Sequence, residues 1–393
     1  MGRQRAHGHF RPQGERLALV MGPVILLSVI FFVSFVARQI TGPSLPALEA
    51  ELGLSHSHSG LFILLSGVGF CLSQLGASLV AARWGYKLCI LLSIWGTAAA
   101  CVLISFSYSV WLLYPLFLAM GMAGGLYVPS GIALITLLVR PQDWGKAMGI
   151  HELAPNFALI SVPFVATLAV VLGTWRWGYQ GCGAALAVLG MLYLFLGSDV
   201  QARPSLPSFA LIREVASQPS FWQLSILISL AVGVETGVYS MTPLYLVSER
   251  GFSLAEANEL LGLSRIPAVF LVLLAGWLTD RLNPPLAIAI ALAATGSAII
   301  VLGLGPDATL VPAIYIQASA SACLFPPILS MASANSSTAN RALTLSLSIA
   351  VAPVIGGGIL PAAIAVAGDL YSFGVGIAAA GLFTLSGIFL VKR

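Results

Sequence analysis

Twelve long apolar segments constrain the fold of this chain more than any other feature of its sequence. Each holds about 20 or more mainly apolar residues, enough for a helix that rises about 1.5 Å per residue to cross a bilayer core of about 30 Å. Charged or turn-rich stretches separate the segments. The sequence therefore predicts an all-α membrane protein with twelve transmembrane helices near 18–48, 59–82, 88–107, 110–138, 146–172, 178–197, 220–247, 257–279, 285–304, 310–333, 342–367 and 371–391.

The low content of charged residues supports this interpretation. Only 8% of the residues are charged and 58% are hydrophobic, whereas soluble domains carry roughly 25% charged residues. This balance excludes a water-soluble enzyme. Although the net charge is +4, the placement of charges matters more than their sum, and we expect the lipid bilayer rather than nucleic acid as partner. The five cysteines fall inside the predicted spans without zinc-site spacing, so we expect no metal and no cofactor.

The lysines and arginines predict the orientation, because cytoplasmic loops of membrane proteins are enriched in them. With the N-terminus inside, only Arg176 and Arg250 fall in outer loops. The cytoplasmic set comprises Arg3, Arg5, Arg11, Arg16, Arg83, Lys87, Arg140, Lys146, Arg203, Arg213, Arg281, Arg341, Lys392 and Arg393. This distribution predicts a multi-pass protein of a bacterial inner membrane with both termini cytoplasmic. A cleaved signal peptide is the less favoured alternative, because the first apolar segment continues through Arg38 to Leu48.

The two parts of the chain resemble each other when the sequence is aligned with itself at an offset of 198 residues. Residues 53–55 (Gly-Leu-Ser) align with 251–253 (Gly-Phe-Ser), Arg83 aligns with Arg281, and residues 154–155 (Ala-Pro) align with 352–353. A polar, proline-containing stretch lies between the repeats. We therefore expect a cytoplasmic tail at 1–17, a six-helix half at 18–197, a cytoplasmic linker at 198–219 and a second six-helix half at 220–393.

One loop of each half resembles the major facilitator superfamily of transporters. The first six positions of its pattern Gly-x-Leu-x-Asp-Arg-x-Gly are matched at 276–281, whereas the first half keeps Arg83 but has Ala82 in place of the acidic residue. The resemblance implies two pseudo-symmetric six-helix halves with a substrate site between them near the midplane. It also implies a gating role for Arg83, Asp280 and Arg281. The alternative is that these residues are ordinary cytoplasmic anchors.

Four ionisable residues remain inside the predicted spans: Arg38, Glu152, Glu235 and Arg265. Each costs roughly 2.5–3.5 kcal/mol on insertion scales and is therefore a functional hypothesis by default. Under the 198-residue offset Arg38 maps next to Glu235. Arg265 lies fifteen residues before Asp280, or roughly 22 Å along a helix. We therefore expect Arg38, Glu235 and Arg265 at similar heights in the membrane.

The two arginines favour an anionic substrate, because a guanidinium stays charged and its fork matches a carboxylate. Arg38 and Arg265 resemble the basic residues on the first and eighth helices of monocarboxylate and other organic-anion carriers of the superfamily. The alternative is that Glu235 and Arg265 neutralise each other while Arg38 extends to the outer interface. Further candidates for substrate contact are Tyr239, Gln39 and Asn156.

Three residues are candidates for proton coupling: Glu235, Glu152 and His151. A carboxylic acid in a water-poor site can exchange a proton near neutral pH, and histidine titrates there without help. For His151 the competing interpretation is a polar residue at a helix end.

These features predict a secondary transporter, and not an enzyme, that moves a small organic anion such as a monocarboxylate or sugar acid with protons. We expect it to act as a monomer. A drug or metabolite exporter is the alternative, although Phe117 stands where drug antiporters have an arginine before Gly121, and their fifth-span Gly-x-x-x-Gly-Pro run is reduced to residues 154–155. A non-transporting membrane sensor is a more distant alternative.

Overall fold

The computed structural model describes residues 14–200, 202–204, 206, 208–335 and 341–391. Eleven helical stretches in this part are long and apolar enough to cross a membrane. The eighth predicted span is also helical but is divided into α12 (Leu254–Ser264) and α13 (Ile266–Leu282). The prediction of an all-α membrane protein with about twelve spans is therefore confirmed.

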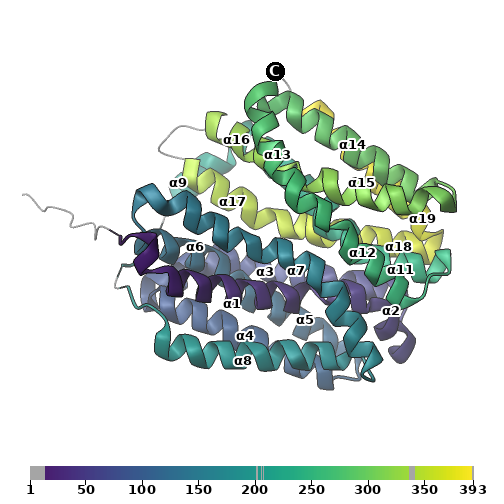
Figure 1. Cartoon of the computed structure of the whole chain (residues 1–393), viewed down its shortest axis with the longest axis horizontal. Coiled ribbons are helices and arrows are strands. Elements are labelled where there is room, and N and C mark those ends of the chain that lie inside the picture. Colours follow the sequence, from purple (N-terminus) through teal and green to yellow (C-terminus); the bar gives the residue numbers. More distant parts are fainter. Residues whose placement is uncertain (1–13, 201, 205, 207, 336–340, 392–393) are drawn as a thin grey trace, which may run out of the picture.

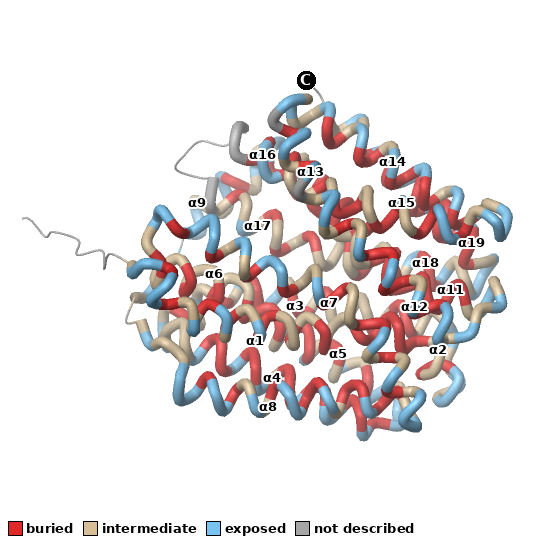
Figure 2. Tube along the Cα trace, in the orientation of Figure 1, coloured by how far each residue is buried: buried red, intermediate tan, exposed pale blue. Residues whose placement is uncertain are grey.

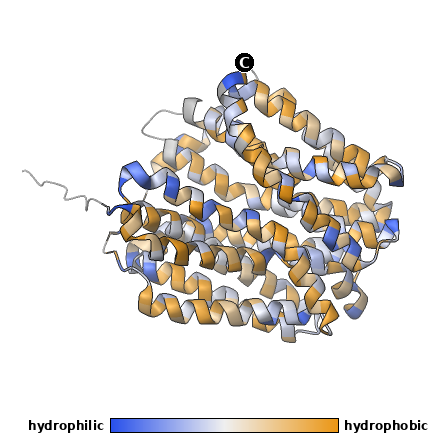
Figure 3. Cartoon of the chain, viewed as in Figure 1, coloured by the Kyte–Doolittle hydropathy of each residue, from blue (hydrophilic) through white to orange (hydrophobic). Residues whose placement is uncertain are grey.

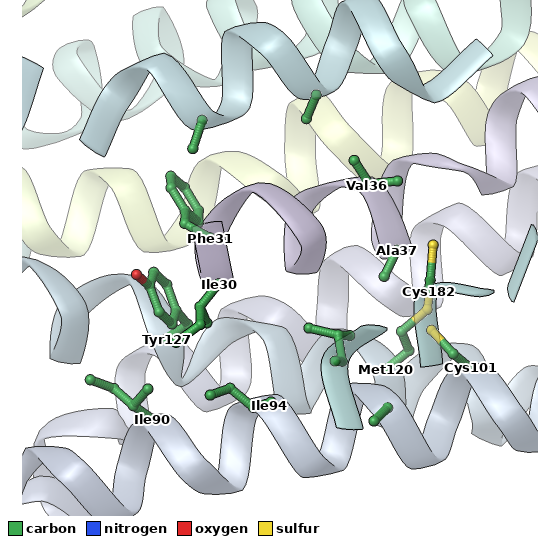
Figure 4. Packing of buried hydrophobic residues seen from close by; sticks show 14 of the residues in the cluster. Ile30, Phe31, Val36, Ala37, Ile90, Ile94, Cys101, Met120, Tyr127 and Cys182 are labelled. Carbon is green, nitrogen blue, oxygen red and sulfur yellow. The ribbon is translucent and has the colours of Figure 1, made fainter. Parts of the chain in front are cut away.

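The first six spans form an N-terminal half whose helices pack around one hydrophobic cluster. Its elements are η1 (Leu17–Leu19), α1 (Met21–Gln39), α2 (Thr41–Leu52), α3 (His56–Trp84), α4 (Tyr86–Phe106), α5 (Val110–Gly125), α6 (Tyr127–Leu138), η2 (Pro141–Asp143), α7 (Trp144–Val171) and α8 (Arg176–Leu196). Figure 4 shows part of this cluster, where side chains of α1, α4, α5 and α8 interdigitate.

The last six spans form a C-terminal half around a second cluster. Besides α12 and α13, its elements are α10 (Pro219–Val232), η3 (Gly233–Gly237), α11 (Val238–Arg250), α14 (Pro284–Leu304), η4 (Asp307–Thr309), α15 (Leu310–Ala322), α16 (Phe325–Asn335), α17 (Arg341–Val354), η5 (Ile355–Ile359), α18 (Leu360–Leu370), α19 (Phe373–Ser386) and η6 (Gly387–Leu390). The short helix α9 (Phe209–Ala216) precedes this half. Figure 1 shows the two halves one above the other.

Large apolar side chains cover much of the outside of the molecule. Phe195 is 75% exposed, Leu103 54% and Phe389 81%, and Figure 2 shows exposed positions recurring along helices α4, α8 and α14. Figure 3 shows hydrophobic residues along the lengths of the helices and hydrophilic ones mainly near their ends. In water such a surface would associate with other molecules, whereas in a bilayer it is solvated by lipid tails.

The two halves touch at the end of the molecule that carries the turns at Gly53 and Gly251, called here the closed end. There α2 packs on α11 and α12 packs on α7, while α3 follows α17, η5 and α18 along its length. Figure 1 shows α2, α11 and α12 together at this end. Small residues permit the close approach, as in other membrane helix pairs. A Cβ on Gly42 would lie 2.7 Å from the Cα of Ser240, and one on Gly60 would lie 2.8 Å from the Cα of Ala362.

The 198-residue offset also relates contacts within each half. Glu51, at the end of α2, accepts hydrogen bonds from the side chains of Trp175 (2.7 Å) and Arg176 (2.8 and 3.0 Å) at the start of α8. Glu249, 198 residues later, accepts from the backbone amides of Phe373 and Gly374 at the start of α19. One carboxylate thus joins the first and last spans of each half, with side-chain donors in one and main-chain donors in the other.

Candidate functional site

Arg38 lies one residue before the end of α1, on the N-terminal half. Pro43 has no N–H to offer the carbonyl of Gln39, and the helix is interrupted there before continuing as α2. The central guanidinium carbon of Arg38 lies 4.4 Å from the ring centre of Phe70 and 5.2 Å from that of Phe35. Its Nε is buried and has no hydrogen-bond partner. Stacking on aromatic rings stabilises such a cation only in part, so Arg38 retains capacity to bind an anion.

Gly124 makes room for the stem of Arg38. A Cβ at this position of α5 would lie 2.7 Å from Cδ of Arg38 and 3.1 Å from its Nε. Any larger residue would have to displace the arginine. Gly124 therefore determines the direction in which the guanidinium points.

Arg265 lies at the junction between α12 and α13 on the C-terminal half. The helix is interrupted here because Pro267 cannot donate a backbone hydrogen bond. Arg265 is 3% exposed. Its Nη2 donates to the carbonyl oxygen of Glu235 at 2.6 Å, and its guanidinium carbon lies 4.8 Å from the ring centre of Tyr239. Its Nε, like that of Arg38, is buried without a partner.

Glu235 lies in the π-helical turn η3, which replaces one α-helical turn in the middle of the seventh span. Turns of this kind occur frequently at functional sites. The carbonyl of Val234 accepts a bond from Nε2 of Gln317 at 2.5 Å, and that of Glu235 accepts from Arg265. The π-helical turn thus supplies two main-chain acceptors to side chains of neighbouring helices.

The contact between Arg265 and Glu235 differs from the ion pair considered as the alternative to an anion site. The bond is to the main chain, and no ion pair joins the two side chains in the described part of the structure. The Glu235 carboxylate interacts electrostatically with Arg265 and with Glu152 of the other half. This carboxylate is not held by a hydrogen bond or an ion pair among the described residues.

Tyr239 connects the two arginines and the two halves. Its hydroxyl donates to the carbonyl oxygen of Leu159 on α7 at 2.8 Å, and its ring packs with Leu159 and Leu261. Phe35, which lies under Arg38, packs against the same cluster. The predicted residues Arg38, Tyr239, Arg265 and Glu235 thus form one continuous set of contacts between the halves.

His151 and Glu152 form a second polar group on α7, and the competing interpretation of His151 as a polar residue at a helix end is wrong, because α7 begins at Trp144 and the side chain is buried. The imidazole is completely buried, with its ring centre 4.6 Å from that of Phe31. Its Nε2 lies 3.3 Å from the hydroxyl of Tyr127, and its Nδ1 lies 3.1 Å from Oε1 of Glu152. Figure 4 shows Phe31 and Tyr127 at this position in the N-terminal half. The Glu152 side chain remains 54% exposed.

The hydrogen bonds of Tyr127, His151 and Glu152 can all form only if the His151–Glu152 pair carries a proton in addition to the one on Nε2. The Tyr127 hydroxyl donates to the carbonyl oxygen of Leu27 at 2.5 Å, because a carbonyl can only accept. Nε2 of His151 must then donate to the tyrosine oxygen. In a neutral imidazole Nδ1 carries a lone pair, so its contact with Glu152 needs a second proton, either on the imidazole or on the carboxyl. The pair therefore holds one exchangeable proton in this geometry.

The other predicted site residues contribute less. The amide nitrogen of Asn156 donates one hydrogen bond to the carbonyl of Glu152 on its own helix at 2.8 Å, which leaves its second N–H and its oxygen available. Gln39 follows Arg38, but its side chain makes no hydrogen bond in the part of the chain that is described. Conversely, the sequence prediction does not include Phe35, Phe70, Gly124, Tyr127 and Gln317 as site residues, although Tyr127 and Gln317 are polar residues within spans.

The predicted gating residues lie apart from this cluster. Arg83 stacks on Trp84 at the end of α3, at 5.6 Å, and Arg281 stacks on Trp277 at the end of α13, at 4.3 Å. Neither arginine forms an ion pair among the described residues. The side chain of Asp280 lies outside the described residues. The role of this loop pair in gating stays a prediction.

Chemically, the cluster can bind an anion and exchange protons. Each half contributes an arginine whose buried Nε has no partner, and Glu235, whose carbonyl binds Arg265, adds a carboxyl group. No group of three histidine, cysteine or acidic residues suited to a metal ion occurs among the residues that were placed.

Comparison with known proteins gives both a family and a fold. The Major Facilitator Superfamily matches residues 27–361. A probable sulfoacetate transporter of Cupriavidus necator is 25% identical over 67% of this chain and 65% of its own length. A multidrug resistance protein of Proteus mirabilis is 29% identical over 40% of each chain. The chain thus spans less than two thirds of the length of these relatives.

Solved structures share the fold at low sequence identity. A bacterial homologue of the human lysosomal transporter Spinster, in an inward-facing and unoccupied conformation, superposes with a TM-score of 0.76. It is 17% identical and covers 94% of each chain. The overall fold of this chain is therefore found in a protein that is distant from it in sequence.

Proposed function

The chain belongs to the major facilitator superfamily, and from this premise we propose that it is a secondary active transporter of a small organic anion, such as a monocarboxylate or sugar acid, coupled to protons. One observation supports the anion above all others: each half contributes an arginine whose buried Nε lacks a partner. A buried charge without a partner is costly, and an anionic substrate would supply the missing acceptor.

The surroundings of the two arginines favour an organic anion. A carboxylate can accept two parallel hydrogen bonds from one guanidinium. The rings of Phe35, Phe70 and Tyr239 stand beside the guanidinium groups and offer apolar surface to a carbon skeleton. Because Arg38 and Arg265 belong to different halves, a substrate that binds both would stabilise a conformation in which the halves approach each other.

Two acidic centres support proton coupling. Glu235 lies close to Arg265 without an ion pair, so protonating its carboxyl breaks no bond seen here. The His151–Glu152 pair holds one exchangeable proton and interacts electrostatically with Glu235 across the halves. In the proposed cycle the anion binds to the arginines while a proton neutralises Glu235, and the loaded site then becomes accessible from the other side.

A drug or metabolite exporter is the second candidate, favoured by the partial match to a multidrug resistance protein. The site offers less support for it. Phe117 packs fully buried against Phe62 at the position where drug antiporters carry an arginine. A lipophilic cation would moreover meet two arginines at the centre of the molecule. A membrane sensor remains the more distant alternative.

We further propose a monomer in a bacterial cytoplasmic membrane with both termini inside. The basis for the orientation is the excess of lysines and arginines in one set of loops. At the end predicted to be outside, Arg176 is bound to Glu51 and Arg250 to Asp307. Both basic residues predicted there therefore already have a carboxylate partner.

The proposal can be tested in proteoliposomes loaded with a pH-sensitive dye. Small carboxylates and sugar acids are added outside, and lipophilic cations such as tetraphenylphosphonium are added in parallel. We expect a carboxylate to acidify the lumen, because anion and proton enter together. If only the lipophilic cations cause a change, and the lumen becomes more alkaline in a way that depends on a pH gradient, the protein is instead an exporter. No response to either panel in protein shown to be folded would contradict both.

A further inference from the structure

The two halves begin their second spans with matched sequences but cap them differently. Under the 198-residue offset, Ser55 corresponds to Ser253 and His58 to Glu256. In the C-terminal half the Ser253 hydroxyl accepts from the backbone amide of Glu256 at 3.2 Å, and the Glu256 carboxylate accepts from the amide of Ser253 at 2.9 Å. This reciprocal capping box satisfies the free amides at the start of α12.

The corresponding helix α3 has no such cap of its own. Histidine stands at position 58 instead of an acid, and the Ser55 hydroxyl is engaged with Nδ1 of this residue at 2.7 Å. The first turn of α3 is capped instead by Asp369 of α18, in the other half. Its carboxylate accepts from the amides of His56 (3.0 Å) and Ser57 (2.8 Å), and from the Ser57 hydroxyl.

Neighbouring contacts hold the same turn. Glu49 of α2 accepts from the Ser59 hydroxyl at 2.6 Å and lies 2.8 Å from Nδ1 of His56. The His56 ring packs against Phe373 of α19, with ring centres 4.6 Å apart. The turn is therefore fixed by its own half through Glu49, and by the opposite half through Asp369 and Phe373.

We propose that Asp369 is a latch that holds the closed end shut by supplying, from the C-terminal half, the cap that α3 lacks. The inference rests on the alternating access of the proposed function, in which these ends must separate. Opening this end then breaks three hydrogen bonds to one carboxylate and leaves two amides of α3 without protein partners. The capping box of α12 lies within one half and is unaffected by the same movement.

The latch can be tested without knowing the substrate, by the reactivity of one cysteine at the closed end. Ser240, which is buried where α11 meets Gly42, becomes the reporter as Ser240→Cys in a chain whose five native cysteines are replaced by serine or alanine. Purified protein is treated with a hydrophilic maleimide, and the labelling rate reports how often the closed end opens.

We expect Asp369→Ala to raise the labelling rate about tenfold, the effect of losing one good helix cap. Asp369→Asn, whose side chain can still cap, should raise it by much less. The matched control is Glu256→Ala, which removes a cap of the same kind within one half and should leave the rate unchanged. Equal increases in Asp369→Ala and Glu256→Ala would contradict the latch, because both would then reflect general loosening.

A second pair of variants separates the latch from simple helix stabilisation. His58→Glu introduces the acidic residue found at the matched position of α12 and gives α3 a cap of its own. If Asp369 only stabilises α3, then adding His58→Glu to Asp369→Ala should return labelling to the starting rate, which would overturn the proposal. If Asp369 links the halves, labelling stays high although thermal stability recovers. Neither result depends on transport, so the proposed anion site can fail independently.

Discussion

Arg38 and Arg265 carry the same charge on opposite halves, but the chain holds them in different ways. Arg265 lies at a helix junction and is fixed by a 2.6 Å bond to the Glu235 carbonyl. The Arg38 guanidinium has no hydrogen bond among the described residues and is held by two aromatic rings and the space over Gly124. One arginine is thus oriented before a ligand arrives, whereas the other is free to adjust. We infer that Arg265 anchors the anion and that Arg38 turns towards it.

The acidic groups differ in a parallel way. Glu235 lies in a π-helical turn near the fixed arginine and has no hydrogen-bonded partner for its carboxylate among the described residues. Glu152 is bonded to a completely buried histidine and forms part of a proton-holding network. The first acid is suited to change charge with the substrate, and the second to pass or store a proton.

Replacing the anchor should have the largest effect. We expect Arg265→Ala to lower carboxylate uptake by about 100-fold, because loss of one partner of a desolvated ion pair costs about 2–5 kcal/mol. Arg265→Lys keeps the charge but loses the paired N–H donors of the guanidinium, and should lower uptake by about tenfold. Uptake into proteoliposomes measures both. Arg213→Ala, at an exposed position of α9, is the control, and normal uptake by Arg265→Ala would show that the residue is structural.

Glu235→Gln should separate binding from coupling. The amide cannot take up a proton, and we expect the variant to bind carboxylates while losing proton-driven accumulation by about tenfold or more. Lumen acidification and counterflow exchange, measured on the same vesicles, distinguish the two. Glu259→Gln, an exposed acid on α12, serves for comparison. An unchanged pH profile in Glu235→Gln would transfer coupling to the His151–Glu152 pair.

Adding a methyl group at Gly124 tests the adjustable arginine. Gly124→Ala would press on Cδ of Arg38, and we expect about a fivefold rise in KM with little change in kcat, because the guanidinium is misdirected but not removed. Gly76→Ala is the matched control, since a Cβ there meets nothing within 4 Å. If both glycine variants behave alike, the position of Arg38 is not limiting.

The smallest effect is expected from Glu152→Gln. Its amide can donate to Nδ1 of His151 and keep the geometry, but it cannot exchange a proton. We expect uptake at the optimum pH to fall by about twofold to threefold while the dependence on pH becomes flatter. Rates across about pH 5.5–8 test this. A loss as large as that of Glu235→Gln would reverse the roles assigned to the two acids.

Much of the fold follows from the sequence because hydrophobic length is a local property. The spans appear within a few residues of the expected ranges, and Glu51 and Glu249 follow the 198-residue offset in their contacts. The interruption at Arg265 is less visible, because a proline two residues later is compatible with a kinked helix as well as a broken one. The π-helical turn around Glu235 depends on neighbours such as Gln317 that lie far away in sequence.

The functional site is only partly predictable, because many of its contacts join residues that lie far apart in the sequence. A charge inside an apolar segment is conspicuous, so Arg38, Glu235 and Arg265 stand out. Burial of His151 depends on Phe31 and Tyr127 from two other helices, and no feature of its own segment indicates it. The Asp369 cap joins residues more than 300 positions apart. Only the missing acid at His58 gives a local signal that the cap comes from elsewhere.

The most direct test of the anion site is thermal stabilisation of the detergent-purified protein by small carboxylates and by lipophilic cations, at about pH 5.5 and about pH 7.5. A ligand that binds the folded state must raise its apparent stability. The account predicts stabilisation by a carboxylate that is lost in Arg265→Ala and weakened in Arg38→Ala. Stabilisation by lipophilic cations alone, or a carboxylate effect that persists in both variants, would contradict it.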